Sequence, residues 1–178
     1  MAGGDRIRLF CGLRLPEATV AALSDWQLEQ LRGVRVVPPE NLHVTLCFLG
    51  SRPPSDVPAI AGELAAAAAE AGPVRLRSAR YRETGSVAMI VCDDVGGRGA
   101  ALAADLGGRL EQLGVYRPER RPWLPHVTVA RFRERPRLGP PLPELGEFSP
   151  SDAAVYVSRL RPGGALYEPL EIAGLGGR

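Results

Sequence analysis

The sequence contains no lysine, and all 22 of its basic residues are arginine. A P-loop, a Schiff-base enzyme and nucleotidyl transfer through a lysine adduct are therefore excluded, because each of these chemistries needs the lysine amine. Arginine cannot replace lysine as the nucleophile, because its guanidinium stays protonated. Since alanine, glycine and proline are also abundant, we interpret the arginine bias as an effect of genome composition.

The chain is also poor in cysteine and carries little net charge. Its three cysteines form no CxxC pair, which excludes zinc-ribbon and thioredoxin-like motifs and favours buried, reduced thiols. A net charge of +2 is too small for a histone-like basic coat, although it leaves room for a local basic groove. No apolar run approaches the ~20 residues of a membrane span, and MAGGDRIRLF lacks the apolar segment of a signal peptide. We therefore expect a cytoplasmic protein that does not enter a membrane.

The order of the predicted elements alternates between strands and helices along a single domain, residues 1–178. Apolar and β-branched stretches predict strands at residues 7–15, 42–49, 74–82, 86–92, 126–132, 153–160 and 166–172. Apolar residues at helical spacing predict helices at residues 17–32, 59–71 and 98–113. Proline-rich residues 136–150 are expected to be mostly irregular.

An internal repeat relates the two halves of the chain. The sequence has two histidines, His43 and His126, which lie 83 residues apart, and each opens the tripeptide His-Val-Thr. The same shift superimposes helix 17–32 on helix 98–113. We therefore expect a bilobal α+β fold with a pseudo-twofold duplication, in which two antiparallel sheets flanked by helices surround a central cleft.

The two His-Val-Thr motifs suit acid–base chemistry at phosphorus. In a strand, residues two apart share a face, so His43 points with Thr45 and His126 points with Thr128. Two imidazoles across a cleft can serve as one base and one acid, as in-line displacement requires. The rival use of two histidines is a metal site, but neither motif has a nearby carboxylate pair or an HxxxH spacing. We expect neither a metal ion nor another cofactor.

The stretches around these motifs resemble a known family. LHVTLCFLG (42–50) and PHVTVARF (125–132) resemble the paired H-x-T signatures of the 2H phosphoesterase superfamily. Together with RLFCGLRLP (8–16), VPPENLHVTLCFLG (37–50), RPERRPWLPHVTVARF (117–132) and YVSRLRPGGALYEPL (156–170), they are similar to the RNA 2′,3′-cyclic phosphodiesterases, also called 2′-5′ RNA ligases. The resemblance spans nearly the whole chain. One departure is Val129, where the family commonly has leucine.

The resemblance implies a bilobal α+β fold with a positively lined cleft and a metal-independent reaction. That reaction would hydrolyse a terminal ribose 2′,3′-cyclic phosphate of RNA to a 2′-phosphate. By position, His43 matches the family's proton donor to the O3′ leaving group, and His126 matches the proton acceptor that activates water. Thr45 and Thr128 would hold the phosphate oxygens. Arg131 would also contact the phosphate, although strict strand alternation from His126 would turn it away from the cleft.

Four other residues are candidates for contacts with RNA. Phe10 and Phe48 could stack on a base, and their alternative place on apolar strands is the core. Arg120 and Arg121 could bind RNA phosphates as a local basic patch, and their alternative is a solvated loop. The sequence by itself leaves each pair open between these two interpretations.

Two other functions stay open at this point. The same site could perform 2′-5′ ligation of RNA or hydrolyse another cyclic or 2′-5′ linked nucleotide. A protein of a different class would be a non-catalytic module that binds RNA ends. Because each chain supplies both halves of its own cleft, we expect a monomer whose partners are RNA ends or nucleotides with a 2′,3′-cyclic phosphate.

Overall fold

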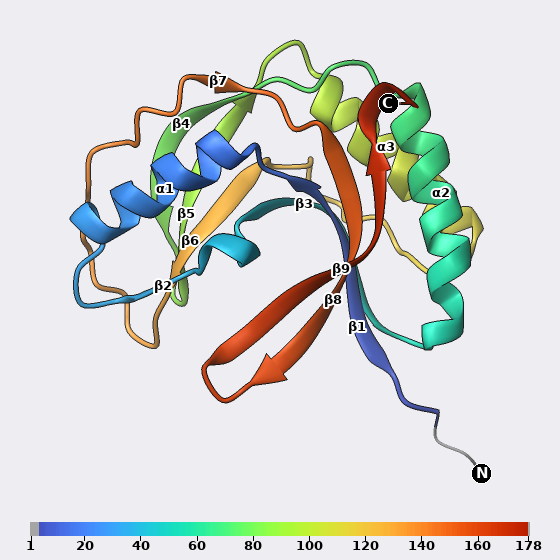
Figure 1. Ribbon diagram of the computed structural model, residues 1–178, viewed down its shortest axis with the longest axis horizontal. Helices are drawn as coiled ribbons and strands as arrows, with labels where there is room; N and C mark the ends of the chain where they lie inside the picture. Colours follow the sequence, from blue (N-terminus) through green and yellow to red (C-terminus); the bar gives the residue numbers. More distant parts are fainter. Residues whose placement is uncertain (1–3, 178) are drawn as a thin grey trace.

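Antiparallel strands and three helices make up the computed structural model (Figure 1). It describes residues 4–177, so residues 1–3 and Arg178 of the predicted domain lie outside the described part. The strands are β1 (Ile7–Arg14), β2 (Arg35–Val36), β3 (His43–Arg52), β4 (Leu76–Glu83), β5 (Val87–Asp94), β6 (His126–Arg131), β7 (Glu147–Phe148), β8 (Asp152–Arg161) and β9 (Gly164–Gly174). The helices are α1 (Glu17–Gln30), α2 (Val57–Glu70) and α3 (Arg98–Gln112), with short 3-10 turns at Pro39–Asn41, Pro54–Asp56 and Leu175–Gly177.

The strands form one curled sheet rather than two separate ones. Its order is β7-β4-β5-β6-β3-β1-β8-β9, with β2 paired to β6, and every pairing is antiparallel. The two halves meet where β3 pairs with β6, through the partners Val44 and Val127. The two expected sheets are therefore the halves of a nine-stranded sheet that is continuous at its centre. The α+β class with antiparallel pairing is confirmed.

The duplication is visible in the register of the central strands. Val44 and Val127 occupy equivalent positions of the repeat, 83 residues apart, and they pair with each other. An antiparallel pair of equivalent residues places a local twofold axis between them. Around that axis, β3 pairs outward with β1, and β6 pairs outward with β5.

Each central strand carries an irregularity at the same place in the repeat. Opposite β1, the register shifts between the partners of Thr45 and Cys47, so Leu46 is the extra residue in β3. Opposite β5, the register shifts between the partners of Thr128 and Ala130, which makes Val129 the extra residue in β6. A bulge of this kind reverses the alternation of side chains that follow it. The two residues directly after each bulge, 47–48 and 130–131, therefore point to the face opposite to the one that simple alternation predicts.

Helices α1 and α3 each pack against the central strand that comes from the other half of the chain. Gln27 of α1 donates from Nε2 to the carbonyls of Val37 and of the bulge residue Val129, at 3.0 and 2.8 Å, so α1 covers the half of the sheet that contains β6. Helix α3 contacts β3, which comes from the first half of the chain, and lies beside α2, which packs on β8 and β9 (Figure 1). The two halves of the chain therefore share helix packing across the repeat.

The core lies between the sheet and these helices. Val44 and Val127 are fully buried, as their position opposite the histidine face requires. In α1 the buried side chains include Leu23, Trp26 and Gln27, whereas Leu28 is 73% exposed. Leu28 lies five positions after Leu23, and that spacing turns it away from the buried stripe. Among residues 4–177, no helix is long and apolar enough to cross a membrane.

The predicted elements are present, with shifts of a few residues at their ends. Two short strands were missed. Strand β2 ends at Val36, the first residue of the turn that Pro38 and Pro39 predict over residues 36–41, and β7 lies within the segment predicted to be mostly irregular. Both are two residues long, too short for hydrophobic periodicity to reveal them.

Candidate active site

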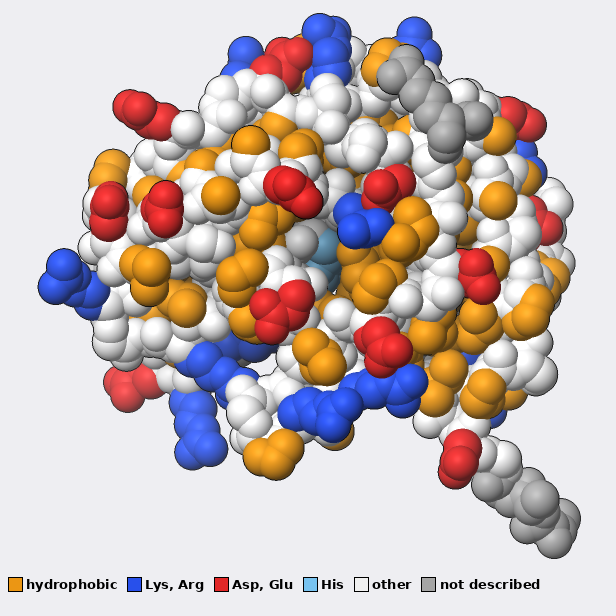
Figure 2. Space-filling view, in the orientation of Figure 1, with side chains coloured by type: hydrophobic (Ala, Val, Ile, Leu, Met, Phe, Trp, Pro, Cys, Tyr) orange, Lys and Arg blue, Asp and Glu red, His pale blue; other side chains and the backbone are white. Residues whose placement is uncertain are grey.

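The two histidines begin the two central strands and are held in the same way. Nδ1 of His43 donates to the carbonyl of Asn41 at 2.7 Å, and Nδ1 of His126 donates to the carbonyl of Leu124 at 2.8 Å. A carbonyl only accepts, so these contacts assign the ring proton of each neutral imidazole to Nδ1. Nε2 of each ring then carries no proton and is the atom that can accept or deliver one. In Figure 2 the pale blue of histidine is visible at the bottom of a hollow near the middle of the face shown.

His43 lies in an aromatic cage on the first half of the sheet. Its ring centroid is 4.7 Å from that of Phe10, 5.4 Å from that of Tyr167 and 5.8 Å from that of Tyr156. The pKa of His43 is lowered from 6.5 to about 4, chiefly by burial among these rings; the hydrogen bond to the Asn41 carbonyl acts in the opposite direction, and the charges of His126 and Arg131 add to the lowering. The imidazole is therefore neutral at pH 7 in the free protein.

The threonines of both motifs share the histidine face. The hydroxyl of Thr45 donates to Nε2 of His43 at 2.9 Å, since that nitrogen carries no proton when the ring is neutral. The backbone carbonyl of Thr45 accepts a hydrogen bond from Nε1 of Trp123 at 2.9 Å, which ties the loop before β6 to β3. Thr128 is the equivalent residue of β6, and its side chain is partly exposed on the same face.

The two bulges decide where Arg131 and Phe48 point. Because Val129 is an extra residue, Arg131 lies on the same face as His126 and Thr128, not on the opposite face that strict alternation predicts. Its Nη2 donates to the hydroxyl of Tyr167 at 3.2 Å, and its charge acts on His43. Phe48 is the equivalent residue of β3, 49% exposed, and the guanidinium of Arg8 lies 5.4 Å from its ring centroid.

The remaining sequence candidates are placed differently. Phe10 is only 4% exposed, and its ring packs on Tyr156, with centroids 4.9 Å apart, and against His43. That burial leaves Phe10 as a wall of the His43 cage rather than a free stacking surface. Arg120 and Arg121 lie exposed in the loop before β6, where Arg121 forms a loose ion pair with Glu119 at 3.8 Å.

His43 is positioned by two residues that were not among the predicted site residues. Asn41 is 5% exposed, and its side-chain amide donates to the Ala165 carbonyl at 2.7 Å and accepts from the Tyr167 N–H at 3.0 Å, while its own backbone carbonyl holds His43. Gly12 lies against His43, because a Cβ there would be 3.2 Å from Cδ2 of the imidazole. A glycine inside a strand is a recognised sign of close approach and was the available signal. Asn41 gave no sequence signal.

Within the part of the chain that the structure describes, no group of three or more His, Cys, Asp or Glu side chains is arranged to hold a metal ion. The three cysteines are buried and free, and burial raises the pKa of the Cys47 and Cys92 thiols to about 12. These thiols are therefore protonated at pH 7, as expected of residues that fill the core.

Comparisons with known proteins agree with this architecture. Residues 13–83 match the family model described as LigT like Phosphoesterase. The RNA 2′,3′-cyclic phosphodiesterase of Thermus thermophilus is 34% identical over 93% of this chain and 88% of its own. The protein of the same name from Methanocaldococcus jannaschii is 22% identical over 93% of this chain and 99% of its own.

Solved structures show the same fold. TT0787 of Thermus thermophilus superimposes with a TM-score of 0.82 at 32% identity, covering 97% of this chain and all of its own. E. coli LigT complexed with 3′-AMP superimposes with a TM-score of 0.77 at 22% identity, covering 96% of this chain and 99% of its own. These likenesses define the class of the protein, a phosphoesterase. Within that class, the chain belongs to the LigT-like family.

Proposed function

We propose that the protein hydrolyses the terminal ribose 2′,3′-cyclic phosphate of RNA to a 2′-phosphate, without a metal ion. The observation that carries this proposal is that both imidazoles are held in the same way: each donates from Nδ1 to a backbone carbonyl, which leaves an unprotonated Nε2 for proton transfer. The relatives named RNA 2′,3′-cyclic phosphodiesterase support the choice of substrate. Only ribose has the 2′-oxygen that closes such a ring.

In the proposed reaction, Nε2 of His126 accepts a proton from water as the water oxygen bonds to phosphorus. The bond from phosphorus to O3′ breaks, and Nε2 of His43 delivers a proton to O3′. The hydroxyls of Thr45 and Thr128 and the guanidinium of Arg131 hold the non-bridging oxygens and stabilise the charge that develops there. Acid and base lie on opposite sides of the phosphate, as in-line displacement requires.

The donor role requires His43 to gain a proton at Nε2 before the reaction. Its pKa of about 4 in the free protein leaves it neutral at pH 7. A cyclic phosphate carries a negative charge, and an anion beside an imidazole favours the protonated ring. In our proposal, substrate binding therefore supplies the charge that raises the pKa of His43. Solvent then resets both histidines after each turnover.

The first experiment is hydrolysis of a terminal cyclic phosphate in EDTA, with the product identified by ³¹P NMR. We expect undiminished turnover and a 2′-phosphate. Loss of activity in EDTA or a 3′-phosphate product would contradict the mechanism, and RNA binding without turnover would favour a binding module. Oligomers and mononucleotides are compared in the same assay to expose a ligase or another nucleotide hydrolase.

The second experiment replaces each histidine separately. His43→Ala and His126→Ala should each abolish turnover, because neither imidazole can perform the proton transfer of the other. Circular dichroism should show that both variants keep the fold. Turnover near that of the unchanged protein in either variant would remove that histidine from the mechanism.

We further propose that the working unit is a single domain of one chain in the cytoplasm. Both histidine motifs come from one chain and meet through the pairing of β3 with β6, so the cleft needs no second copy. Sedimentation at assay concentration should give the mass of one chain, 19.0 kDa. A dimer that loses activity on dilution would contradict this expectation.

A further inference from the structure

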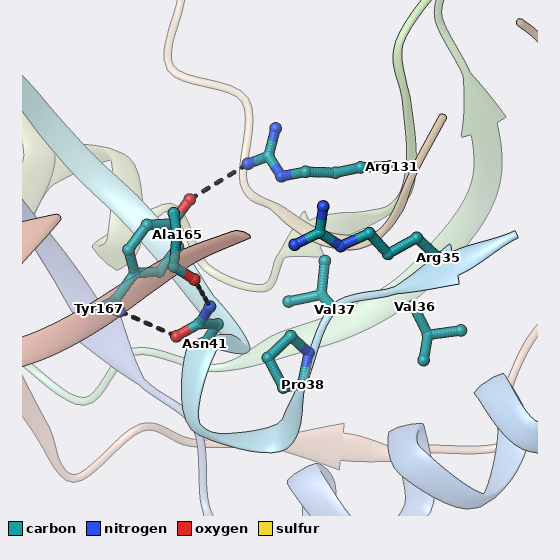
Figure 3. Close-up of a pocket in the computed structure, with 8 residues that line it drawn as sticks. All are labelled: Arg35, Val36, Val37, Pro38, Asn41, Arg131, Ala165 and Tyr167. Atoms are coloured by element: carbon teal, nitrogen blue, oxygen red, sulfur yellow. Dashed lines mark hydrogen bonds between the residues drawn. The ribbon is translucent and has the colours of Figure 1, made fainter. Parts of the chain in front are cut away.

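A pocket beside the active site contains two arginines that face each other across paired strands. Arg35 of β2 is the direct partner of Arg131 of β6, and both line the pocket together with Asn41, Ala165 and Tyr167. Figure 3 shows both side chains extending toward Tyr167, above Val37. Like charges directly opposite on paired strands repel. The arrangement therefore concentrates positive charge at one point of the surface.

Within the part of the chain that the structure describes, no carboxylate neutralises this pair. Among residues 4–177, the ion pairs involve other arginines, and neither Arg35 nor Arg131 has an Asp or Glu partner within 4.0 Å. Arg131 donates to the Tyr167 hydroxyl, which keeps its own proton available for an acceptor. Two guanidiniums and one hydroxyl donor therefore converge on the same space, and an anion with several oxygens is the ligand they suit.

The β8–β9 hairpin leaves space for the Arg35 side chain. Gly164, the first residue of β9, has a φ of 122°, and a Cβ at this position would overlap Nη2 of Arg35. The guanidinium therefore lies directly against the hairpin backbone. A side chain at position 164 would require the Arg35 guanidinium to move from this position.

The pocket shares two of its walls with the site of His43. Asn41 lines the pocket and holds Nδ1 of His43 through its carbonyl, and the Tyr167 ring lies edge-on to the imidazole with centroids 5.4 Å apart. A group bound between the arginines thus lies one aromatic ring away from His43. In a nucleotide, the ribose separates the 2′,3′-cyclic phosphate from the phosphate on its 5′ side, so one nucleotide can offer an anion to each site.

We propose that Arg35 and the Tyr167 hydroxyl form a second anion subsite that binds the phosphate on the 5′ side of the terminal nucleotide, with Arg131 placed between this phosphate and the cyclic phosphate that it holds in the proposed function. The identity of this ligand rests on the proposed function. The subsite selects the end of an RNA chain, which carries that phosphate, over a nucleoside cyclic phosphate with a free 5′-hydroxyl.

The kinetic test compares adenosine 2′,3′-cyclic phosphate with a 5′-hydroxyl, with a 5′-phosphate, and as the 3′-terminal residue of a dinucleotide. The unchanged protein should prefer either phosphate-bearing substrate in kcat/KM by on the order of tenfold, since hydrogen bonds to a charged group are lost without it. Arg35→Met retains the aliphatic stem and should reduce this preference to about twofold or less. Arg80→Met, an exposed arginine of β4, is the matched control and should retain it.

A binding measurement separates the subsite from the reaction. Calorimetry gives Kd for adenosine 2′-phosphate and for adenosine 2′,5′-bisphosphate, neither of which needs turnover. Tighter binding of the bisphosphate that depends on Arg35 upholds the subsite even if no cyclic phosphate is hydrolysed, in which case the proposed function alone fails. Equal handling of the paired ligands by the unchanged protein, or a full preference retained by Arg35→Met, overturns the subsite.

Discussion

Protonation of His43 should destabilise the folded protein in a defined pH window. The pKa of His43 is lowered from 6.5 to about 4, chiefly by burial in its aromatic cage. The unfolded chain therefore binds a proton at higher pH than the folded chain does. The stabilising contribution of the neutral ring is complete above pH 6.5, is lost progressively as the pH falls, and is gone below pH 4. At about 1.4 kcal/mol per pKa unit, its size is about 3 kcal/mol.

The variant His43→Gln isolates this contribution, because glutamine can still donate to the Asn41 carbonyl but does not titrate. Urea unfolding at several pH values between 4 and 7 gives the free energy of unfolding of both proteins. Between pH 7 and pH 4, the unchanged protein should lose about 3 kcal/mol more than the variant. Parallel curves would refute the argument from burial, because they would show that His43 titrates alike in the folded and unfolded chains.

The ring itself can be followed in the folded protein. The sequence contains two histidines, so NMR should show two imidazole Hε1 resonances, and the one missing in His43→Gln belongs to His43. Its titration midpoint should lie near pH 4 in the free protein. With saturating adenosine 2′-phosphate the midpoint should move upward, because the bound anion favours the imidazolium. A midpoint unchanged by the anion would remove the basis for His43 as proton donor.

Three further substitutions test other parts of the site. Asn41→Ala should lower the free energy of unfolding by about 2–4 kcal/mol in urea, because the Ala165 carbonyl and the Tyr167 N–H both lose their partner; a loss below about 0.5 kcal/mol would contradict this. Thr128→Val should reduce kcat/KM about tenfold or more while circular dichroism melting stays nearly unchanged, and retained activity would remove its hydroxyl from the phosphate site. Phe48→Ala should raise KM about tenfold with little change in stability, because Phe48 is half exposed; an unchanged KM would show that no base stacks there.

Much of the fold and the centre of the site could be predicted from local patterns. Because residues two apart in a strand share a face, the sequence placed His43 with Thr45 and His126 with Thr128. The internal repeat related the two motifs to each other. Arg131 could not be placed in this way, because the extra residue that turns it toward the histidines, Val129, is one apolar residue in an apolar run. Nothing in such a run marks a bulge.

The cage around His43 was also beyond local patterns. It is assembled from Phe10 of β1, Tyr156 of β8 and Tyr167 of β9, which are brought together by the pairing of β1 with β8, more than a hundred residues apart, and by the β8–β9 hairpin. Asn41 contributes through contacts with β9 that are equally distant in sequence. Such contacts depend on the whole topology of the sheet, so a pattern within one stretch of residues does not reveal them.

In a duplicated site, the surroundings must distinguish the two histidines, since two equivalent imidazoles would serve equally well as acid or base. The structure breaks the equivalence at matched positions. Phe10 of β1 pairs with Phe48 of β3, and Val87 of β5 occupies the matching position opposite Arg131 of β6. His43 is therefore surrounded by aromatic rings, whereas His126 is not. After the two equivalent bulges, β6 presents Arg131 and β3 presents Phe48. In the proposed reaction, this asymmetry would let a nucleotide with a charged end and a flat base bind in one orientation, which would bring the leaving oxygen to His43 rather than to His126.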